Sequence, residues 1–135
     1  MNYNEINNKL KEINIEDNIW LIYVGIILLS WYSNSLERKY FLYNDLDSKD
    51  KYRKIIIIIF SILVIVYIYF FQSSIDDIHF LKSTDSIKKI KLTELSAIGS
   101  LLIVISGLIF LYIAYTDQDI DVEIAFNWCL IYNLL

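Results

Sequence analysis

Four carboxylates recur at alternate positions late in the chain, and residues of this type at this spacing could bind a metal ion. They are Asp117, Asp119, Asp121 and Glu123. This spacing is typical of a calcium loop, but an EF-hand loop also needs Gly at its sixth position and Glu at its twelfth. Val122 and Trp128 stand there instead. We therefore predict an acidic end to a helix, which could attract a divalent cation only weakly if it were extended.

The other reactive side chains are isolated from one another along the sequence. His79 follows Asp76 and Asp77, but one histidine and two adjacent carboxylates do not supply a tetrahedral metal site. Cys129 has no second cysteine with which to form a disulfide and no neighbouring histidine to activate its thiol. All three glycines lie within apolar stretches, which leaves no phosphate-binding loop. We expect no enzyme activity, no cofactor and no metal site.

The distribution of apolar residues points to a membrane. Hydrophobic residues form 56% of the 135 residues, above the roughly 45–50% of a soluble domain. They are gathered in blocks with the charges between them, whereas a soluble core would interleave polar residues at the period of a helix or a strand. The net charge of −4 is small and locally mixed, so we expect no nucleic-acid binding. We predict a single all-α integral membrane domain, residues 1–135, in contact with the lipid bilayer.

Three charge-free stretches, residues 18–36, 55–75 and 95–116, are predicted to be transmembrane helices. A helix needs about 20 apolar residues to cross the hydrocarbon layer. The first stretch is marginal, because only residues 19–32 are strongly apolar, although Trp and Tyr flank both of its ends as they do at membrane interfaces. A cleaved signal peptide is the alternative for this stretch. The acids that precede it argue against cleavage, since a signal peptide begins with positive charge.

The remaining segments are predicted to lie at the membrane surfaces. Residues 1–17 form either a short amphipathic helix or a frayed tail. Residues 37–54 form a charged connector, with turn residues at Asn44-Asp45 and Asp47-Ser48. Residues 76–94 form a linker of mixed charge, in which residues 86–92 suit a helix or a strand, and Thr93 is the expected cap of the third helix. Residues 117–135 form an acidic and then apolar tail.

The third stretch differs from the others in its small residues. They are Ser96, Gly99, Ser100, Ser106, Gly107 and Ala114. Ser100, Gly107 and Ala114 recur every seven positions, and small residues let helix backbones approach closely in lipid. We predict a packing seam on this helix, either against the other helices or for self-association with a second copy; scattered small residues of no special role are the alternative.

The charges that flank the three spans predict which end of the chain faces the cytoplasm. Cytoplasmic segments are rich in Lys and Arg, and the first helix usually dominates. Acids precede the first stretch and Arg38-Lys39 follow it, while Arg53-Lys54 precede the second. The third stretch favours the opposite orientation, because its basic flank precedes it and its acidic flank follows it. We predict that the N-terminus lies outside and the C-terminus inside.

Function is predicted mainly from what the spans lack. None of them contains Asp, Glu, Lys, Arg or His, the residues on which proton-coupled transport depends. A non-catalytic accessory or regulatory subunit that binds a membrane-protein partner is the first hypothesis. A holin-like permeabilising protein and a bacteriocin-immunity protein are the alternatives, and the acidic tail argues against the holin. The lack of Pro and the abundance of Ile, Asn and Lys are typical of an AT-rich genome, so we expect the cell membrane of a bacterium.

Overall fold

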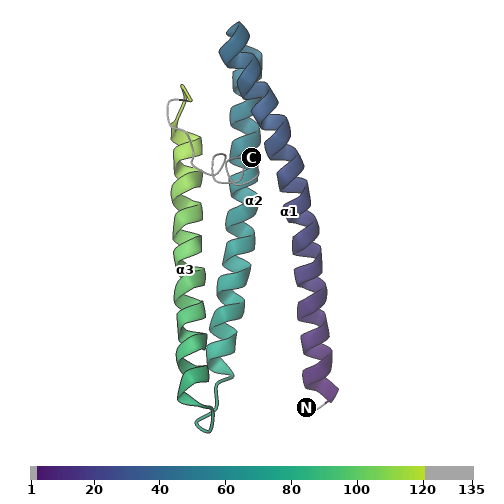
Figure 1. Cartoon of the computed structure of the whole chain (residues 1–135), viewed down its shortest axis with the longest axis vertical. Coiled ribbons are helices and arrows are strands. Elements are labelled where there is room, and N and C mark those ends of the chain that lie inside the picture. Colours follow the sequence, from purple (N-terminus) through teal and green to yellow (C-terminus); the bar gives the residue numbers. More distant parts are fainter. Residues whose placement is uncertain (1–2, 121–135) are drawn as a thin grey trace. The chain divides into compact units, whose positions relative to one another are not determined.

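Each charge-free stretch lies inside a helix that is longer than the stretch itself. The computed structural model describes residues 3–120, and these form three α-helices with no strand among the residues described (Figure 1). The helices are α1 (Tyr3–Tyr43), α2 (Leu46–His79) and α3 (Ile87–Thr116). By length and composition all three could cross a membrane. The predicted all-α class, with three helices of membrane length, is confirmed.

The helices extend well beyond the hydrocarbon layer. Their lengths are 41, 34 and 30 residues, which at 1.5 Å per residue correspond to about 60, 50 and 45 Å. The hydrocarbon layer is only about 30 Å thick. The N-terminal segment is helical from Tyr3 and runs into α1 without a break, so it is a continuation of the first helix and not a separate one. No Pro, and no Gly before Gly25, interrupts it.

The charged connector 37–54 is also almost entirely helical. Its non-helical part is Asn44-Asp45 alone, so Asp47-Ser48 belong to the first turn of α2 and not to a turn of their own. The charges do not end the helix because they pair along it: the ammonium of Lys51 lies 2.5 Å from Asp47, and that of Lys54 lies 2.6 Å from Asp50. Opposite charges four residues apart stabilise a helix.

The turn between α1 and α2 is held by local contacts. Asn44 has φ 52°, and its N–H donates to the carbonyl oxygen of Tyr40 at 2.8 Å. Asn tolerates this left-handed conformation better than most residues, and it commonly ends a helix. The carboxylate of Asp45 then accepts hydrogen bonds from the Asp47 N–H at 3.2 Å and the Ser48 hydroxyl at 2.7 Å. These two residues therefore end one helix and begin the next.

The connection between α2 and α3, residues 80–86, is longer. Ser86 is the N-cap of α3, and its hydroxyl accepts from the Lys89 N–H at 3.2 Å. The prediction of Thr93 as the cap was wrong, because the helix begins in the lysine-rich segment before the apolar stretch. Thr93 lies inside α3 and donates to the carbonyl oxygen of Lys89 at 3.0 Å. Residues 86–92 are thus the start of a helix and not a strand.

The chain divides into two compact units, residues 1–55 and 56–135, with the boundary inside α2. In the first unit the Lys49 ammonium lies 5.3 Å from the centre of the Tyr40 ring. In the second unit the rest of α2 runs antiparallel to α3 (Figure 1). Phe60 and Phe110 join these two helices, with stacked rings whose centres lie 5.7 Å apart.

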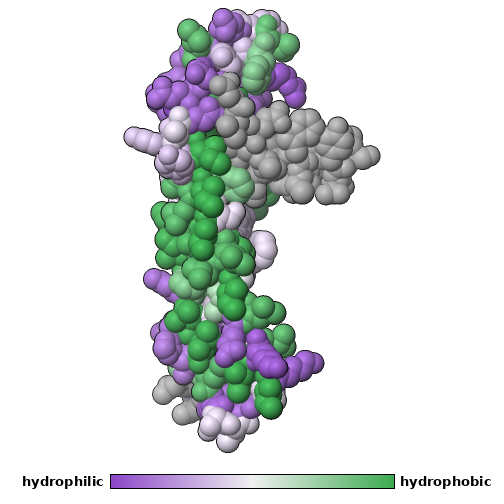
Figure 2. Space-filling view, turned by 90° about the vertical axis from the view of Figure 1, so that its left-hand side faces the viewer, coloured by the Kyte–Doolittle hydropathy of each residue, from purple (hydrophilic) through white to green (hydrophobic). Residues whose placement is uncertain are grey.

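The side of the second unit on which α3 lies is mostly apolar along the helix. Figure 2 shows green apolar side chains along its middle and purple hydrophilic side chains toward its lower end, where α3 begins. Such a surface suits lipid, because lipid tails solvate apolar side chains, whereas the charges need water or headgroups.

Candidate functional site

The acidic series is only partly within the described residues. Asp117 directly follows α3, and its N–H donates to the carbonyl oxygen of Ile113 at 2.8 Å. The Asp119 N–H donates to the Asp117 carboxylate at 3.2 Å. Asp121, Glu123 and Cys129 lie outside the described residues. Among residues 3–120, no three His, Cys, Asp or Glu side chains form a group that could hold a metal ion. Asp117 is thus the C-cap of α3, and Asp119 hydrogen-bonds to it.

The small residues of α3 divide between two faces. Gly107 and Ala114 are buried, and Ser100 is partly buried. A Cβ added at Gly107 would lie 2.9 Å from a ring carbon of Tyr67 and 3.3 Å from a methyl group of Val64. Gly107 therefore allows α2 and α3 of the same chain to approach closely.

The other members of the series are turned elsewhere. Ser96 and Ser106 are exposed, and a Cβ at Gly99 would have no atom within 4 Å. Gly99 and Ser106 are seven residues apart and so share a helix face. Three large side chains recur at the same interval beside them, each more than half exposed: Leu95 at 63%, Leu102 at 60% and Ile109 at 54%. We name the five residues Leu95, Gly99, Leu102, Ser106 and Ile109 the outer face of α3. This face and the buried face were predicted as one seam, although an offset of one residue, about 100° around a helix, separates Ser106 from Gly107.

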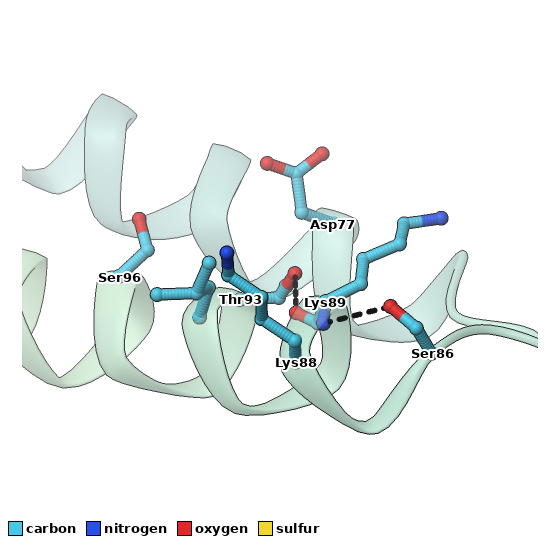
Figure 3. Close-up of a pocket in the computed structure, with 7 residues that line it drawn as sticks. Asp77, Ser86, Lys88, Lys89, Thr93 and Ser96 are labelled. Carbon is cyan, nitrogen blue, oxygen red and sulfur yellow. Dashed lines mark hydrogen bonds between the residues drawn. The ribbon is translucent and has the colours of Figure 1, made fainter.

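A groove lies where α3 begins beside the end of α2, and the sequence analysis did not predict it. Its volume is about 430 Å³ (Figure 3). We name it the α2–α3 groove, and it is lined by Asp77, Ser86, Lys88, Lys89, Leu92, Thr93 and Ser96. Asp77 comes from α2 and the others from α3 and its cap. Ser96 shares a face with the partly buried Ser100, one turn further along, and is itself exposed, so the groove forms where that face is no longer covered.

Some of the charged side chains around the groove form ion pairs and others do not. The Lys89 ammonium lies 2.9 Å from the Asp85 carboxylate. The pKa of Asp85 is lowered, first by the hydrogen bond from the Lys82 backbone N–H and then by Lys89. Asp77 and Lys88, by contrast, form no ion pair with any residue that the structure describes. The groove thus offers one carboxylate and one ammonium that are available to a ligand.

The predicted chemistry-bearing residues do not meet at this site. His79, the last residue of α2, is exposed and does not line the groove. The groove contributes hydroxyl, carboxylate and ammonium groups, which bind charge and donate or accept hydrogen bonds.

Comparisons with known proteins add no family to this description: no family model matches the chain, and no curated protein or solved structure is significantly similar to it.

Proposed function

We propose that this chain is a multi-pass protein of the cell membrane that acts without catalysis, as an accessory or regulatory subunit for a membrane-protein partner. The outer face of α3 carries the proposal. Helices associate in lipid through small residues, because lipid tails solvate Leu and Ile as well as a protein does. Gly99 and Ser106 are small, share a face and are not used by the packing of α3 against α2.

The position of Gly107 determines how this proposal must be tested. A bulky residue there would meet Tyr67 of the same chain, so a lost interaction would report damage to the chain's own helix pair. Gly99→Leu adds the same side chain where no atom lies within 4 Å. Gly25 on α1 is equally open and supplies a matched control.

The experiment compares tagged full-length chains purified from their native membrane. Gly99→Leu is expected to lose the co-purifying membrane protein, whereas Gly25→Leu retains it. Energy transfer between two differently labelled copies in vesicles tests self-association through the same face. Partner recovery and energy transfer that are both unchanged by Gly99→Leu would refute a binding role for the outer face.

We further propose that the N-terminus faces outward and the C-terminus the cytoplasm of a bacterium. The basic flanks of the first two spans support this orientation. Reporters active on only one side of the membrane, fused after Leu135 and within residues 76–94, are expected to give a cytoplasmic C-terminus and an external linker. If both reporters lay on the same side, the third stretch would not cross the membrane.

A further inference from the structure

If α3 crosses the bilayer from Leu95 onward, the α2–α3 groove extends from the edge of the hydrocarbon layer to just beyond the lipid headgroups. Leu92 and Lys88 precede Leu95 by three and seven residues, or about 4.5 and 10 Å along the helix axis. The headgroup region extends about 5–8 Å beyond the hydrocarbon on each side. Leu92 therefore lies within the headgroup region, and the backbone of Lys88 lies just beyond it.

The free charges of the groove have opposite signs. Asp77 stands on α2 and Lys88 on α3, and neither forms an ion pair within residues 3–120. The surrounding linker is balanced as well, because its four acids match its four lysines: Asp76, Asp77, Asp85 and Glu94 against Lys82, Lys88, Lys89 and Lys91. Sites for anionic lipids carry an excess of Lys and Arg. A balanced groove instead favours a ligand that carries both charges.

The rest of the lining suits the neck of a phospholipid. Leu92, which lines the groove, is 56% exposed, and the Ser96 hydroxyl makes no hydrogen bond to any described residue. Ser96 is also the lining residue nearest in sequence to the middle of the span. A phospholipid that enters from the bilayer would therefore meet the Ser96 hydroxyl and the Leu92 side chain before the two charges. Figure 3 shows Ser96 further along α3 than Lys88 and Lys89.

We propose that the α2–α3 groove binds the headgroup of a zwitterionic phospholipid with a primary ammonium, of the ethanolamine class. Lys88 binds the phosphate, and Asp77 accepts hydrogen bonds from the ammonium. This inference rests on the proposed membrane spans of α2 and α3, and it does not depend on the partner. A choline headgroup has no N–H to donate to Asp77, and a phosphoglycerol headgroup leaves the Asp77 carboxylate unpaired beside a second negative charge. The groove therefore selects ethanolamine over both.

The test uses native mass spectrometry of the full-length protein in detergent micelles, titrated with ethanolamine, choline and glycerol phospholipids of identical acyl chains. Asp77→Asn is expected to weaken ethanolamine-lipid binding about fivefold, to the level of the choline lipid, as for loss of a partly exposed charged hydrogen bond. Lys88→Gln is expected to weaken all three lipids. Asp76→Asn and Lys91→Gln make the same changes next to the groove without touching its lining, and are expected to leave binding unchanged.

Three outcomes would overturn the proposal. One is equal binding of ethanolamine and choline lipids by the unmodified chain. Another is an equal effect of Asp76→Asn and Asp77→Asn. The third is displacement of the lipid by soluble glycerophosphoethanolamine at the same concentration, which would assign the groove to a soluble ligand. Carbonate washing tests the spans separately: release of the protein from membranes would refute the spans, whereas a retained protein with no ethanolamine preference would refute the groove alone.

Discussion

The two helix connections of this chain use similar residues in different ways. Asn44-Asp45 makes a two-residue turn between α1 and α2, and the ions that follow it are paired along α2. Residues 80–86 make the longer connection between α2 and α3, with Lys89 paired to Asp85 but Asp77 and Lys88 left unpaired within the described residues. Charged residues at a membrane surface can thus complete a helix in one connection and remain available for a ligand in the other.

The two connections also differ in where their helices are held. The first is fixed at the turn itself, by the Asn44 backbone and the Asp45 carboxylate. The second also has local contacts, since Ser86 caps α3 and the Asp85 carboxylate accepts the Lys82 N–H. Its two helices pack closely further along as well, where a Cβ added at Gly107 would lie 2.9 Å from Tyr67 and Phe60 stacks on Phe110. The α2–α3 groove lies near the second connection, away from this close packing. Substitutions should therefore separate the two connections.

The largest expected effect is that of Gly107→Leu. A side chain at Gly107 would meet the Tyr67 ring at 2.9 Å, and overpacking of this kind typically costs about 1–3 kcal/mol. We expect a lower midpoint of SDS-induced unfolding in micelles, measured by circular dichroism. Gly99→Leu, where no atom lies within 4 Å of the added Cβ, is the control. Equal midpoints for the two variants would mean that the close approach at Gly107 does not hold α2 and α3 together.

Asn44→Val should loosen the first connection alone. Valine in the left-handed conformation of Asn44 is disfavoured by about 1–2 kcal/mol. We expect faster hydrogen exchange and faster limited proteolysis at residues 40–48, with residues 80–92 unchanged. Asn44→Gly, which accepts positive φ without strain, should leave both regions as they are. Faster exchange in both regions would show that the two connections unfold together.

Ser86→Ala should loosen the second connection without affecting the first. Loss of an N-cap hydroxyl costs about 1 kcal/mol, and Ser86 caps α3 by accepting the Lys89 N–H. We expect faster exchange of residues 87–90. Thr93→Ala is the matched control, since an exchange of similar size inside a helix changes stability by at most about 0.5 kcal/mol. A larger increase in exchange for Thr93→Ala than for Ser86→Ala would mean that the helix effectively begins at Thr93.

The membrane helices were predictable from the sequence, whereas their ends were not. Absence of charge marked residues 55–75 and 95–116, and both stretches lie inside the observed helices. That signal reports where lipid contact stops, and a helix continues past this point when its charges pair at intervals of four residues, as Lys51 and Asp47 do. For the same reason the sequence left residues 86–92 open between a helix and a strand, and the start of α3 was wrongly predicted at Thr93.

The candidate site was less accessible to sequence reasoning because it depends on long-range packing. The small residues of α3 were predicted as one seam, and only contact with Tyr67 of α2 distinguishes the face of Gly107 from that of Gly99. The α2–α3 groove brings Asp77 together with Lys88, which is eleven residues later in the sequence. Their proximity requires the chain to reverse between them, and no local pattern specifies how far apart the two helix ends then lie.

The smallest expected effect is a loss of stability at low pH. Both connections should show it, the first through Asp45 and the second through Asp85. The Ser48 hydroxyl is the main group that lowers the pKa of Asp45, and the Lys82 N–H is the main group that lowers the pKa of Asp85. A carboxyl whose pKa is lower in the folded state stabilises the fold above its unfolded pKa of about 4, and this contribution is lost as the pH falls through the folded value. Both connections should therefore loosen below about pH 4.

Amide chemical shifts can separate the two acid responses. The Asp47 N–H reports on Asp45, and the Lys82 N–H reports on Asp85, since each donates to that carboxylate. In an NMR titration from about pH 6 to about pH 3, chosen to cross the carboxyl range, Asp45→Asn should remove the part of the shift change at Asp47 that follows Asp45 and leave the change at Lys82. Asp85→Asn should do the opposite. A single variant that abolished both changes would mean that one carboxylate governs both connections, and the contrast between them would then fail.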